Sequence, residues 1–276
     1  MGEKLPELER LLVGWVREAG EIALNYFHHS GPLRFKHGRE AVTEADREIE
    51  RLLSARIRAR FPDDAVSGEE FGRVEPESAG AEGAAPAAGR VWHVDPIDGT
   101  LNFALGLPNF CTSVALMDGE RILAAIVHQP LLDETFTASA GEGARLGGKP
   151  IHVSDRPALS EAIVSAQLQK RGRFIGNAPL LQAILLGTMK MRRLGTIALE
   201  MAYLADGRFD ALVAGKGEPQ PLYDVAGGIL LVQEAGGRVT DHLGDPYKPH
   251  ATDLIASNGL VHDELISLIR KWDEPA

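Results

Sequence analysis

The segment 91–103 constrains the fold more than any other part of the chain. It reads Val-Trp-His-Val-Asp-Pro-Ile-Asp-Gly-Thr-Leu-Asn-Phe. The apolar run 91–94 predicts a buried strand, and Asp95-Pro96 is expected to end it because proline has no N–H for a sheet ladder. The following Asp98-Gly99-Thr100 is a polar turn whose free backbone N–H groups can face an anion. Carboxylates beside free amides indicate metal and phosphate, although the bare aspartate spacing is also typical of an ordinary turn.

Composition limits the classes of protein that the chain can belong to. Its 276 residues are 44% hydrophobic and 25% charged, which allows a sizeable core in one large domain or two subdomains. No apolar run approaches the roughly 18 to 20 residues that span a bilayer. A net charge of −10 argues against nucleic acid and anionic membranes as partners. The single Cys111 and the absence of an export-signal pattern lead us to expect a cytoplasmic protein.

Two helices are predicted in the first sixty residues. Apolar residues in 8–27 recur at helical spacing, and a basic loop is expected at 36–39. Thr43 and Asp46 have the spacing of a capping box that begins a second helix, which should run to about residue 61. Taken alone, Asp46 is a first-turn carboxylate that faces the helix dipole.

A short strand is expected to lead into an acidic turn at 65–70. The Glu69-Glu70 pair in that turn is, by itself, typical of a solvated surface. The Ala- and Gly-rich segment 75–89 has too few large apolar residues to pack, so it is predicted to be a loose surface loop.

After the central segment, the hydrophobic pattern predicts an antiparallel meander followed by an α/β unit. The meander strands are 110–117, 122–127 and 134–138, with Asp118-Gly119 as a hairpin turn. The second half alternates strands and helices. Its strands are expected at 162–166, 190–194 and 209–213, and its helices at 179–186, 197–205 and, as the last helical pattern, 225–235. Thr196 and Asp224 precede two of these helices and are candidate N-caps.

Five motifs, taken together and in order, resemble those of the inositol monophosphatase family, the Mg²⁺-dependent, lithium-sensitive phosphatases of small phosphorylated metabolites. They are Lys36 with Val42-Thr43-Glu44-Ala45-Asp46, Gly68-Glu69-Glu70, Asp95-Pro96-Ile97-Asp98-Gly99-Thr100 with Asn102-Phe103, Gly195-Thr196-Ile197-Ala198, and Tyr223-Asp224 leading to Glu234-Ala235-Gly236-Gly237. Two departures are visible. Glu40-Ala41 stands where the family usually has Asp before the Val-Thr pair, and Tyr223 replaces the usual Trp.

The resemblance implies a mixed α+β and α/β fold, a layered αβαβα sandwich of the inositol monophosphatase and fructose-1,6-bisphosphatase type. Residues 1–145 would form an N-terminal α+β subdomain with the antiparallel sheet and most metal ligands. Residues 146–276 would form a C-terminal α/β subdomain that supplies Asp224 and the substrate pocket. The resemblance further implies a homodimer.

The resemblance also assigns the metal site. The ligands would be Glu69, Asp95, the carbonyl of Ile97, Asp98 and Asp224, and they would hold two or three Mg²⁺ ions per active site. An all-oxygen ligand set suits Mg²⁺, whereas nine scattered histidines and one cysteine are a poor basis for zinc.

Catalytic and substrate-binding roles follow from the same resemblance. Thr100, oriented by Asp46, would position the attacking water together with Glu69. The expected substrate contacts are Lys36, Asp98, Gly99, Thr100, Gly195, Thr196, Ala198 and Glu218. Lys216 is an alternative to Glu218 and could pair with a second phosphate.

The predicted activity is hydrolysis of inositol monophosphate or a related small phosphorylated metabolite. The alternatives within the superfamily are a fructose-1,6-bisphosphatase, a nucleotide-bisphosphate phosphatase and a histidinol phosphatase. Leu101-Asn102-Phe103 favours the inositol phosphatase type, since nucleotide-bisphosphate members usually have Lys-Glu-Phe there. An alternative from another class is a metal or phosphometabolite sensor without catalysis.

Overall fold

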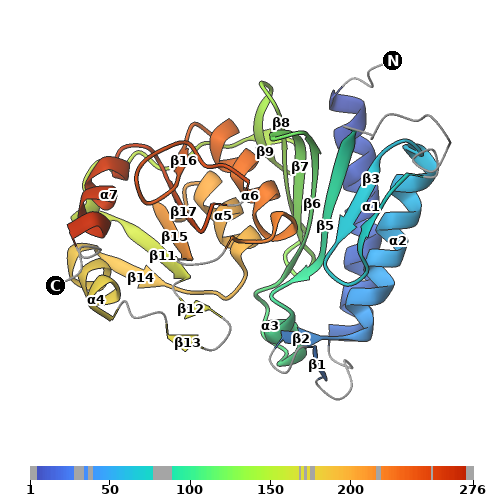
Figure 1. Ribbon diagram of the computed structural model, residues 1–276, viewed down its shortest axis with the longest axis horizontal. Helices are drawn as coiled ribbons and strands as arrows, with labels where there is room; N and C mark the ends of the chain where they lie inside the picture. The colour runs from blue at the N-terminus through green and yellow to red at the C-terminus, as the bar shows by residue number, and fades with distance from the viewer. Residues whose placement is uncertain are drawn as a thin grey trace.

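Helices and sheets alternate in layers across the molecule (Figure 1). The computed structural model describes residues 5–27, 34–36, 40–76, 89–167, 169–170, 173–174, 178–215, 219–249 and 251–271. In Figure 1 the layers from right to left are outer helices, the large sheet, central helices, the smaller sheet and further outer helices. The predicted αβαβα sandwich is therefore confirmed.

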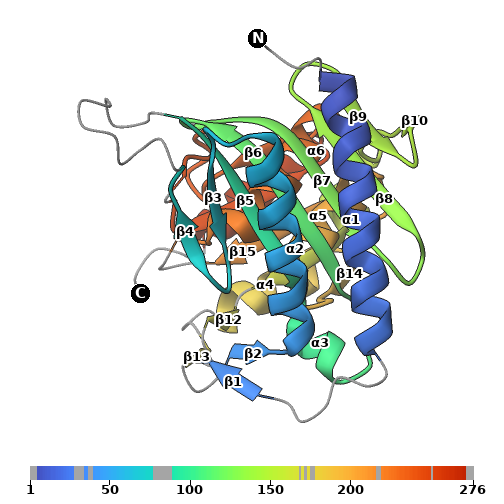
Figure 2. The same cartoon turned by 90° about the vertical axis from the view of Figure 1, so that its right-hand side faces the viewer.

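The first outer layer consists of α1 (Leu5–Phe27) and α2 (Glu44–Arg60), which cross one face of the large sheet (Figure 2). Both helices lie where the apolar periodicity predicts them. The predicted capping box is present at the start of α2, where Asp46 accepts the backbone N–H of Thr43 at 2.8 Å. The apolar faces of both helices pack on the sheet, and the core that they form also contains Trp92 and Phe103.

The large sheet has eight strands in the order β10-β9-β8-β7-β6-β5-β3-β4. Among its pairs, β3 and β5 run parallel and the others antiparallel. The predicted meander is β6–β8, and β4, β9 and β10 extend the sheet beyond the prediction. The strands are β3 (Ala65–Gly68), β4 (Gly72–Val74), β5 (Arg90–Asp98), β6 (Cys111–Asp118), β7 (Arg121–Gln129), β8 (Glu134–Ser139), β9 (Gly143–Leu146) and β10 (Lys149–Pro150).

The prediction that Asp95-Pro96 ends the central strand is wrong. β5 continues to Asp98, with a shift of register against β6 between Asp95 and Asp98. Because the pairing with β6 is irregular between Asp95 and Asp98, Pro96 can lie in the strand although it has no backbone N–H to donate to β6. The Pro96 carbonyl accepts a hydrogen bond from the Thr112 hydroxyl at 2.8 Å. The strand therefore carries both aspartates to its very end.

The central helical layer consists of α5 (Ile197–Ala205) and α6 (Leu222–Glu234). Both helices pack between the two sheets, and their side chains form one core with residues of both. The bounds of α5 agree with the prediction, whereas α6 begins three residues early. Asp224 consequently lies in the first turn of α6 and Pro221 occupies the N-cap, so the N-cap prediction for Asp224 is wrong.

The smaller sheet has five strands in the order β14-β11-β15-β17-β16, with parallel and antiparallel pairs. Its outer face is covered by α4 (Ala178–Gly187) and α7 (His262–Lys271). The prediction missed α7, β16 and β17, which follow the segment taken as the last helix. The strands are β11 (Ile163–Gln167), β14 (Lys190–Arg192), β15 (Ala211–Gly215), β16 (Arg238–Thr240) and β17 (Asp253–Ser257).

Smaller elements complete the fold. They are the hairpins β1 (Arg34–Lys36) with β2 (Glu40–Val42) and β12 (Gln169–Lys170) with β13 (Arg173–Phe174), the helix α3 (Thr100–Ala104), and the 3-10 turn Leu159–Glu161. Lys36, predicted in a loop, ends β1, because it pairs with Glu40 across the hairpin. The loop predicted at 75–89 falls largely outside the described residues.

The two predicted subdomains, 1–145 and 146–276, stay a prediction. The large sheet is built from residues 65–150 and the smaller one from 163–257. Among the helices described, none combines the length and apolar character that a bilayer crossing requires.

Candidate active site

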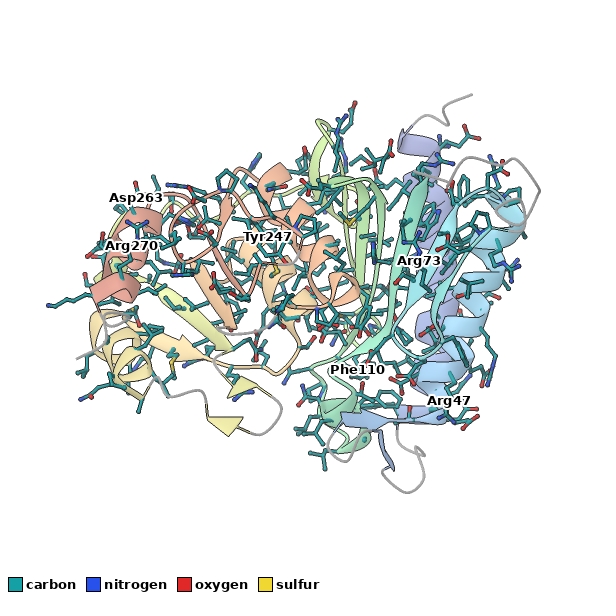
Figure 3. All side chains as sticks on the ribbon, in the orientation of Figure 1. Arg47, Arg73, Phe110, Tyr247, Asp263 and Arg270 are labelled. Carbon is teal, nitrogen blue, oxygen red and sulfur yellow. The ribbon has the colours of Figure 1, made fainter. Side chains whose placement is uncertain are left out.

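The end of β5 is where the predicted site residues gather. β5 delivers Asp95, Ile97 and Asp98, and α3 starts immediately after the turn at Gly99. Phe110, labelled beside α3 in Figure 3, supports that helix by packing against the ring of Phe103, with the two ring centroids 4.9 Å apart. The site is therefore supported by β5 and by the packed rings of Phe103 and Phe110.

Asp95 is a buried carboxylate, with a residue exposure of 2%. Its Oδ1 has no hydrogen-bond partner among the described residues. Burial raises the pKa of Asp95 well above its ordinary value, and the negative charges of Glu69, Asp98 and Asp224 add to the effect. An oxygen that is both buried and unpaired is available to a ligand.

Asp98 is held by groups from the second half of the chain. Its Oδ2 accepts hydrogen bonds from the Thr196 hydroxyl and the Ala198 amide, both at 2.7 Å. Burial raises the pKa of Asp98 to about 7, against the effect of these two donors and with the charges of Glu200 and Glu69 adding to it. The start of α5 thus fixes the orientation of this carboxylate.

The prediction that Thr196 caps α5 is only half right. Thr196 occupies the N-cap position, but its side chain makes no capping hydrogen bond. Its hydroxyl is directed at Asp98 instead. The Thr196 hydroxyl and the Ala198 N–H both donate to Asp98, so contacts of these two residues with substrate stay a prediction.

Asp46, Thr100 and Ile97 form a connected group. The Thr100 hydroxyl lies 2.9 Å from the Ile97 carbonyl oxygen and 3.3 Å from Asp46 Oδ1. Burial raises the pKa of Asp46 to about 7, although its hydrogen bonds with Thr43 act in the opposite direction. The predicted pairing of Thr100 with Asp46 is therefore present in the geometry.

Gly99 makes the turn that brings Thr100 back toward Asp46. Its φ of 89° and ψ of 34° lie in the left-handed region. A Cβ at this position would lie 2.8 Å from the Asn109 carbonyl oxygen and 3.2 Å from Thr196 Cβ. Only glycine fits here, both for its dihedral angles and for the space.

Glu69 and Asp224 reach the site from two other elements. Glu69 follows β3, and its backbone N–H donates to the Val94 carbonyl at 3.2 Å. Asp224 lies in the first turn of α6, and its charge acts on Asp95. The carboxylates thus come from β5, the turn after β3, α2 and α6.

The remaining predicted substrate contacts are described to different extents. Gly195 has a φ of 79° and donates its N–H to Glu200 at 3.3 Å. The backbone of Lys36 is described in β1, but its side chain lies outside the described residues, as do Glu218 and Lys216 entirely.

The sequence interpretation missed two residues that connect parts of the site. Asn102 Nδ2 lies 2.7 Å from both the Asn109 and the Leu194 carbonyl oxygens, which links α3 to the loop before α5. Glu200 is fully buried in α5 and accepts the Leu194 and Gly195 amides. A lone acidic residue inside the apolar helix Ile197–Ala205 was the signal that could have found Glu200.

Comparison with known proteins agrees with this arrangement. A sequence profile described as "Inositol monophosphatase family" matches residues 4–274. The chain belongs to the inositol monophosphatase family. It is thus a member of a family of phosphatases, and the resemblance predicted from its five motifs is confirmed.

Relatives within the family carry several names. A Thermotoga maritima protein named fructose-1,6-bisphosphatase/inositol-1-monophosphatase is 34% identical over 259 residues, which is 93% of each chain. A Pseudomonas aeruginosa protein named Nus factor SuhB is 34% identical over 267 residues, 94% of each chain. The crystal structure of the extragenic suppressor protein suhB from Bartonella henselae matches with a TM-score of 0.87 at 28% identity, over 96% of this chain and 99% of that one.

Family membership implies Mg²⁺, and the residues present fit that ion. Within the described ranges, no three His, Cys, Asp or Glu side chains are grouped closely enough to hold one ion by themselves. Mg²⁺ does not require such a cage, because it keeps several waters and takes one or two carboxylates plus substrate phosphate. The unpaired Asp95 Oδ1, surrounded by negative charge, is the donor that such an ion needs.

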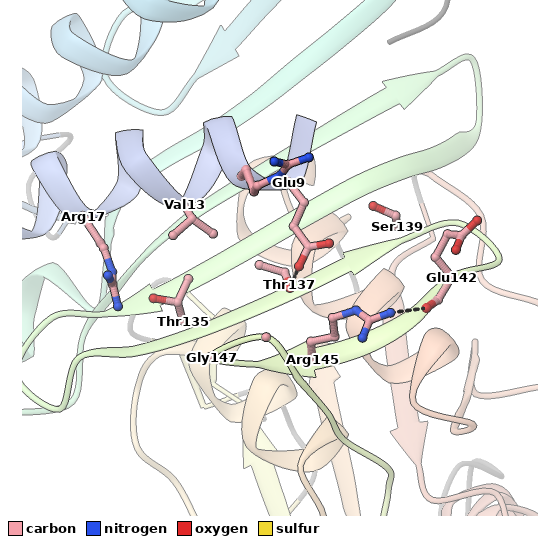
Figure 4. Close-up of a pocket in the computed structure, with 11 residues that line it drawn as sticks. Glu9, Val13, Arg17, Thr135, Thr137, Ser139, Glu142, Arg145 and Gly147 are labelled. Carbon is pink, nitrogen blue, oxygen red and sulfur yellow. Dashed lines mark hydrogen bonds between the residues drawn. The ribbon is translucent and has the colours of Figure 1, made fainter. Parts of the chain in front are cut away.

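A separate cavity of about 510 Å³ lies between α1 and strands β8 and β9 (Figure 4). It is lined by charged and hydroxyl side chains, among them Arg17, Thr137 and Arg145. None of the predicted site residues lines it, so this cavity is not the candidate active site.

Proposed function

We propose that the protein is a Mg²⁺-dependent phosphomonoesterase that releases phosphate from inositol monophosphate or a related small phosphorylated metabolite. The observation that carries the proposal is the buried, unpaired Oδ1 of Asp95, on which the charges of Glu69, Asp98 and Asp224 act. A buried carboxylate among other carboxylates is costly to the fold unless a cation compensates the charge.

The proposed ligands are those that the family motifs predict. Glu69, Asp95, the Ile97 carbonyl, Asp98 and Asp224 would together hold the ions. The Ile97 carbonyl already accepts the Thr100 hydroxyl, but a carbonyl oxygen has a second lone pair for an ion.

Bound Mg²⁺ supplies Lewis-acid stabilisation of phosphate charge and a lower pKa for water. The chain's own residues supply orientation. When the Thr100 hydroxyl donates its hydrogen bond to Asp46, its oxygen lone pairs can accept a hydrogen bond from a water and so orient that water. We propose that Glu69 assists in positioning this water and that the Gly99 and Thr100 amides hold phosphate oxygens.

The remaining substrate contacts are proposed on the family pattern. Asp98, Gly195, Thr196 and Ala198 would line the sugar side, with Lys36 reaching the site from β1. Glu218 would accept hydrogen bonds from hydroxyls, and Lys216 is the alternative, suited to a second phosphate.

The test is a screen of phosphate release. Purified protein is assayed with inositol 1-phosphate, fructose 1,6-bisphosphate, a nucleoside 3′,5′-bisphosphate and histidinol phosphate, each with Mg²⁺ and with EDTA. We expect Mg²⁺-dependent release with inositol 1-phosphate highest. Because the Thermotoga maritima relative carries both names, fructose 1,6-bisphosphate is the second candidate substrate. No phosphate release from any of them would favour the sensor interpretation.

Lithium gives an independent prediction. Li⁺ should inhibit in an uncompetitive or noncompetitive manner, by occupying a metal site after the leaving group departs. Initial rates at several substrate and Li⁺ concentrations will establish the pattern, with Na⁺ at equal ionic strength as the control. Activity that is indifferent to high Li⁺ would count against the inositol phosphatase type.

A homodimer in the cytoplasm is also proposed. Three leucines in and after α3 are strongly exposed, Leu101 at 51%, Leu105 at 61% and Leu107 at 45%, and exposed apolar groups of this kind favour a partner surface. Sedimentation velocity will measure the oligomeric state.

A further inference from the structure

We propose that Glu50 is a positioning residue for the candidate active site, and that it holds the turn that presents Glu69. This inference rests on the proposed function, since Glu69 matters only if the site binds a cation. None of the five family motifs recognised in the sequence includes Glu50.

Glu50 makes two hydrogen bonds to the backbone of that turn. It lies on α2 with an exposure of 1%. Its Oε2 accepts the Glu70 N–H at 2.7 Å, and its Oε1 accepts the Phe71 N–H at 2.9 Å. Hydrogen bonds to an ionised acceptor are stronger than neutral ones, so this contact fixes the turn firmly.

Gly68 gives the carboxylate room to reach the turn. A Cβ at Gly68 would lie 1.9 Å from Glu50 Oε1 and 2.2 Å from its Cδ. Any side chain at this position would displace the Glu50 carboxylate. The glycine of the Gly-Glu-Glu motif is thus explained by its contact with Glu50.

Glu69 is consequently held from both sides. Its own N–H donates to the Val94 carbonyl, immediately before Asp95 on β5. The next two amides donate to Glu50 on α2. The backbone of Glu69 is therefore fixed relative to Asp95.

One helix serves two parts of the site. Asp46 and Glu50 are four residues apart on α2 and project from the same face. Asp46 contacts Thr100, and Glu50 contacts the turn that carries Glu69. A buried carboxylate beside other carboxylates contributes little to stability, so we interpret Glu50 as a residue that positions the turn.

The experiment compares Glu50→Gln with wild type and with Glu48→Gln, which removes the same charge two residues away from an exposed position on α2. A glutamine offers one acceptor oxygen, so one of the two turn amides would face an NH₂ group instead. Mg²⁺ affinity is measured by titration calorimetry. Exchange of the amide hydrogens at residues 69–71 is measured in the metal-free proteins, and melting temperatures are recorded for all three.

We expect Mg²⁺ affinity to fall about tenfold in Glu50→Gln, as is typical when an outer partner of a metal ligand is removed, and to stay unchanged in Glu48→Gln. Amide exchange at 70 and 71 should accelerate only in Glu50→Gln. Mg²⁺ affinity within twofold of wild type would overturn the proposal, even if the melting temperature falls, because that pattern identifies a purely structural residue.

Two further outcomes remain decisive. If Glu50→Gln does not fold, Glu50→Asp carries the test with the same criteria, because it keeps the charge but is too short to reach both amides. If wild type binds no Mg²⁺ and releases no phosphate, the proposed function fails. The positioning contact is then judged by amide exchange alone, and equal exchange in wild type and variant would reject it.

Discussion

The carboxyl groups of Asp46, Asp95 and Asp98 are buried close to further negative charge. Burial raises the pKa of each, and the charge of Glu69 adds to the effect at all three. Folding alone does not favour such an arrangement, because each ionised group loses hydration without gaining a cation. The hydrogen bonds from Thr196 and Ala198 hold Asp98 in place despite this cost. We interpret these residues as arranged for a bound cation.

At the residue scale, Asp98→Asn and Asp224→Asn should each lower kcat by about a thousandfold or more, because on the proposed assignment each removes a negatively charged ligand of the ion that would stabilise the leaving group. Both substitutions keep the side-chain shape, so circular dichroism and melting temperature should still indicate a folded protein. Asp118→Asn, at the exposed β6–β7 turn, is the control and should retain wild-type kcat. Near-wild-type activity of either site variant at saturating Mg²⁺ would refute the ligand assignment.

At the scale of elements, α6 depends on glycine for its place between the sheets. A Cβ at Gly227 would lie 2.7 Å from Ser113 Oγ, and one at Gly228 would lie 2.5 Å from Met201 Cβ. The helix therefore approaches β6 on one side and α5 on the other more closely than alanine would allow. This close packing sets the position of Asp224 relative to β5.

Gly227→Ala should destabilise the protein by about 1–3 kcal/mol, because the added methyl group overpacks the contact with β6. The matched control is Gly14→Ala on α1, where a Cβ would meet nothing within 4 Å. That variant should gain about 0.5–1 kcal/mol from helix propensity. Urea unfolding measures both free energies, and a stabilised Gly227→Ala would show that the helix can shift without cost.

α7 carries a pH-dependent contact. His262 Nε2 lies 2.9 Å from the Thr240 hydroxyl and Nδ1 lies 2.8 Å from the Ser257 hydroxyl. The pKa of His262 is lowered from 6.5 to about 4, mainly by burial and also by the charge of Arg238, while the charge of Asp263 acts in the opposite direction. The folded state therefore binds fewer protons than the unfolded state between these values, so stability is lost as pH falls from 6.5 toward 4.

We expect the free energy of unfolding to fall more between pH 7.5 and pH 5 in wild type than in His262→Gln, which keeps hydrogen-bonding groups but does not titrate. Urea unfolding at the two pH values measures the difference. Equal losses in both proteins would mean that His262 does not contribute to the pH dependence.

The elements that the sequence predicts best are those whose pattern is local. α1, α2 and α5 were predicted within about three residues of their bounds, because apolar spacing and the Thr43–Asp46 cap are properties of one segment. The continuation of β5 through Pro96 could not be predicted in this way, since it depends on the irregular pairing with β6. Short strands such as β9 and the edge strand β10 likewise exist only through their partners.

At the scale of the molecule, the two halves of the chain meet at Asp98. This residue ends β5 of the large sheet, and it accepts hydrogen bonds from Thr196 and Ala198 at the start of α5. Motifs in the sequence could indicate the acidic residues themselves. They could not indicate the roles of Asn102, Glu200 or Glu50, because each of these side chains acts on backbone groups that only the fold brings next to it.

The most direct test of the whole account is the Mg²⁺ dependence of phosphate release by wild type and by Asp95→Asn. Both proteins are stripped of metal with EDTA and titrated with Mg²⁺, using the best substrate of the screen. We predict no release by metal-free wild type, saturable activation by Mg²⁺, and a rate in Asp95→Asn lower by about a thousandfold or more at every Mg²⁺ concentration. Full wild-type activity in EDTA, or near-wild-type rates in Asp95→Asn, would contradict it.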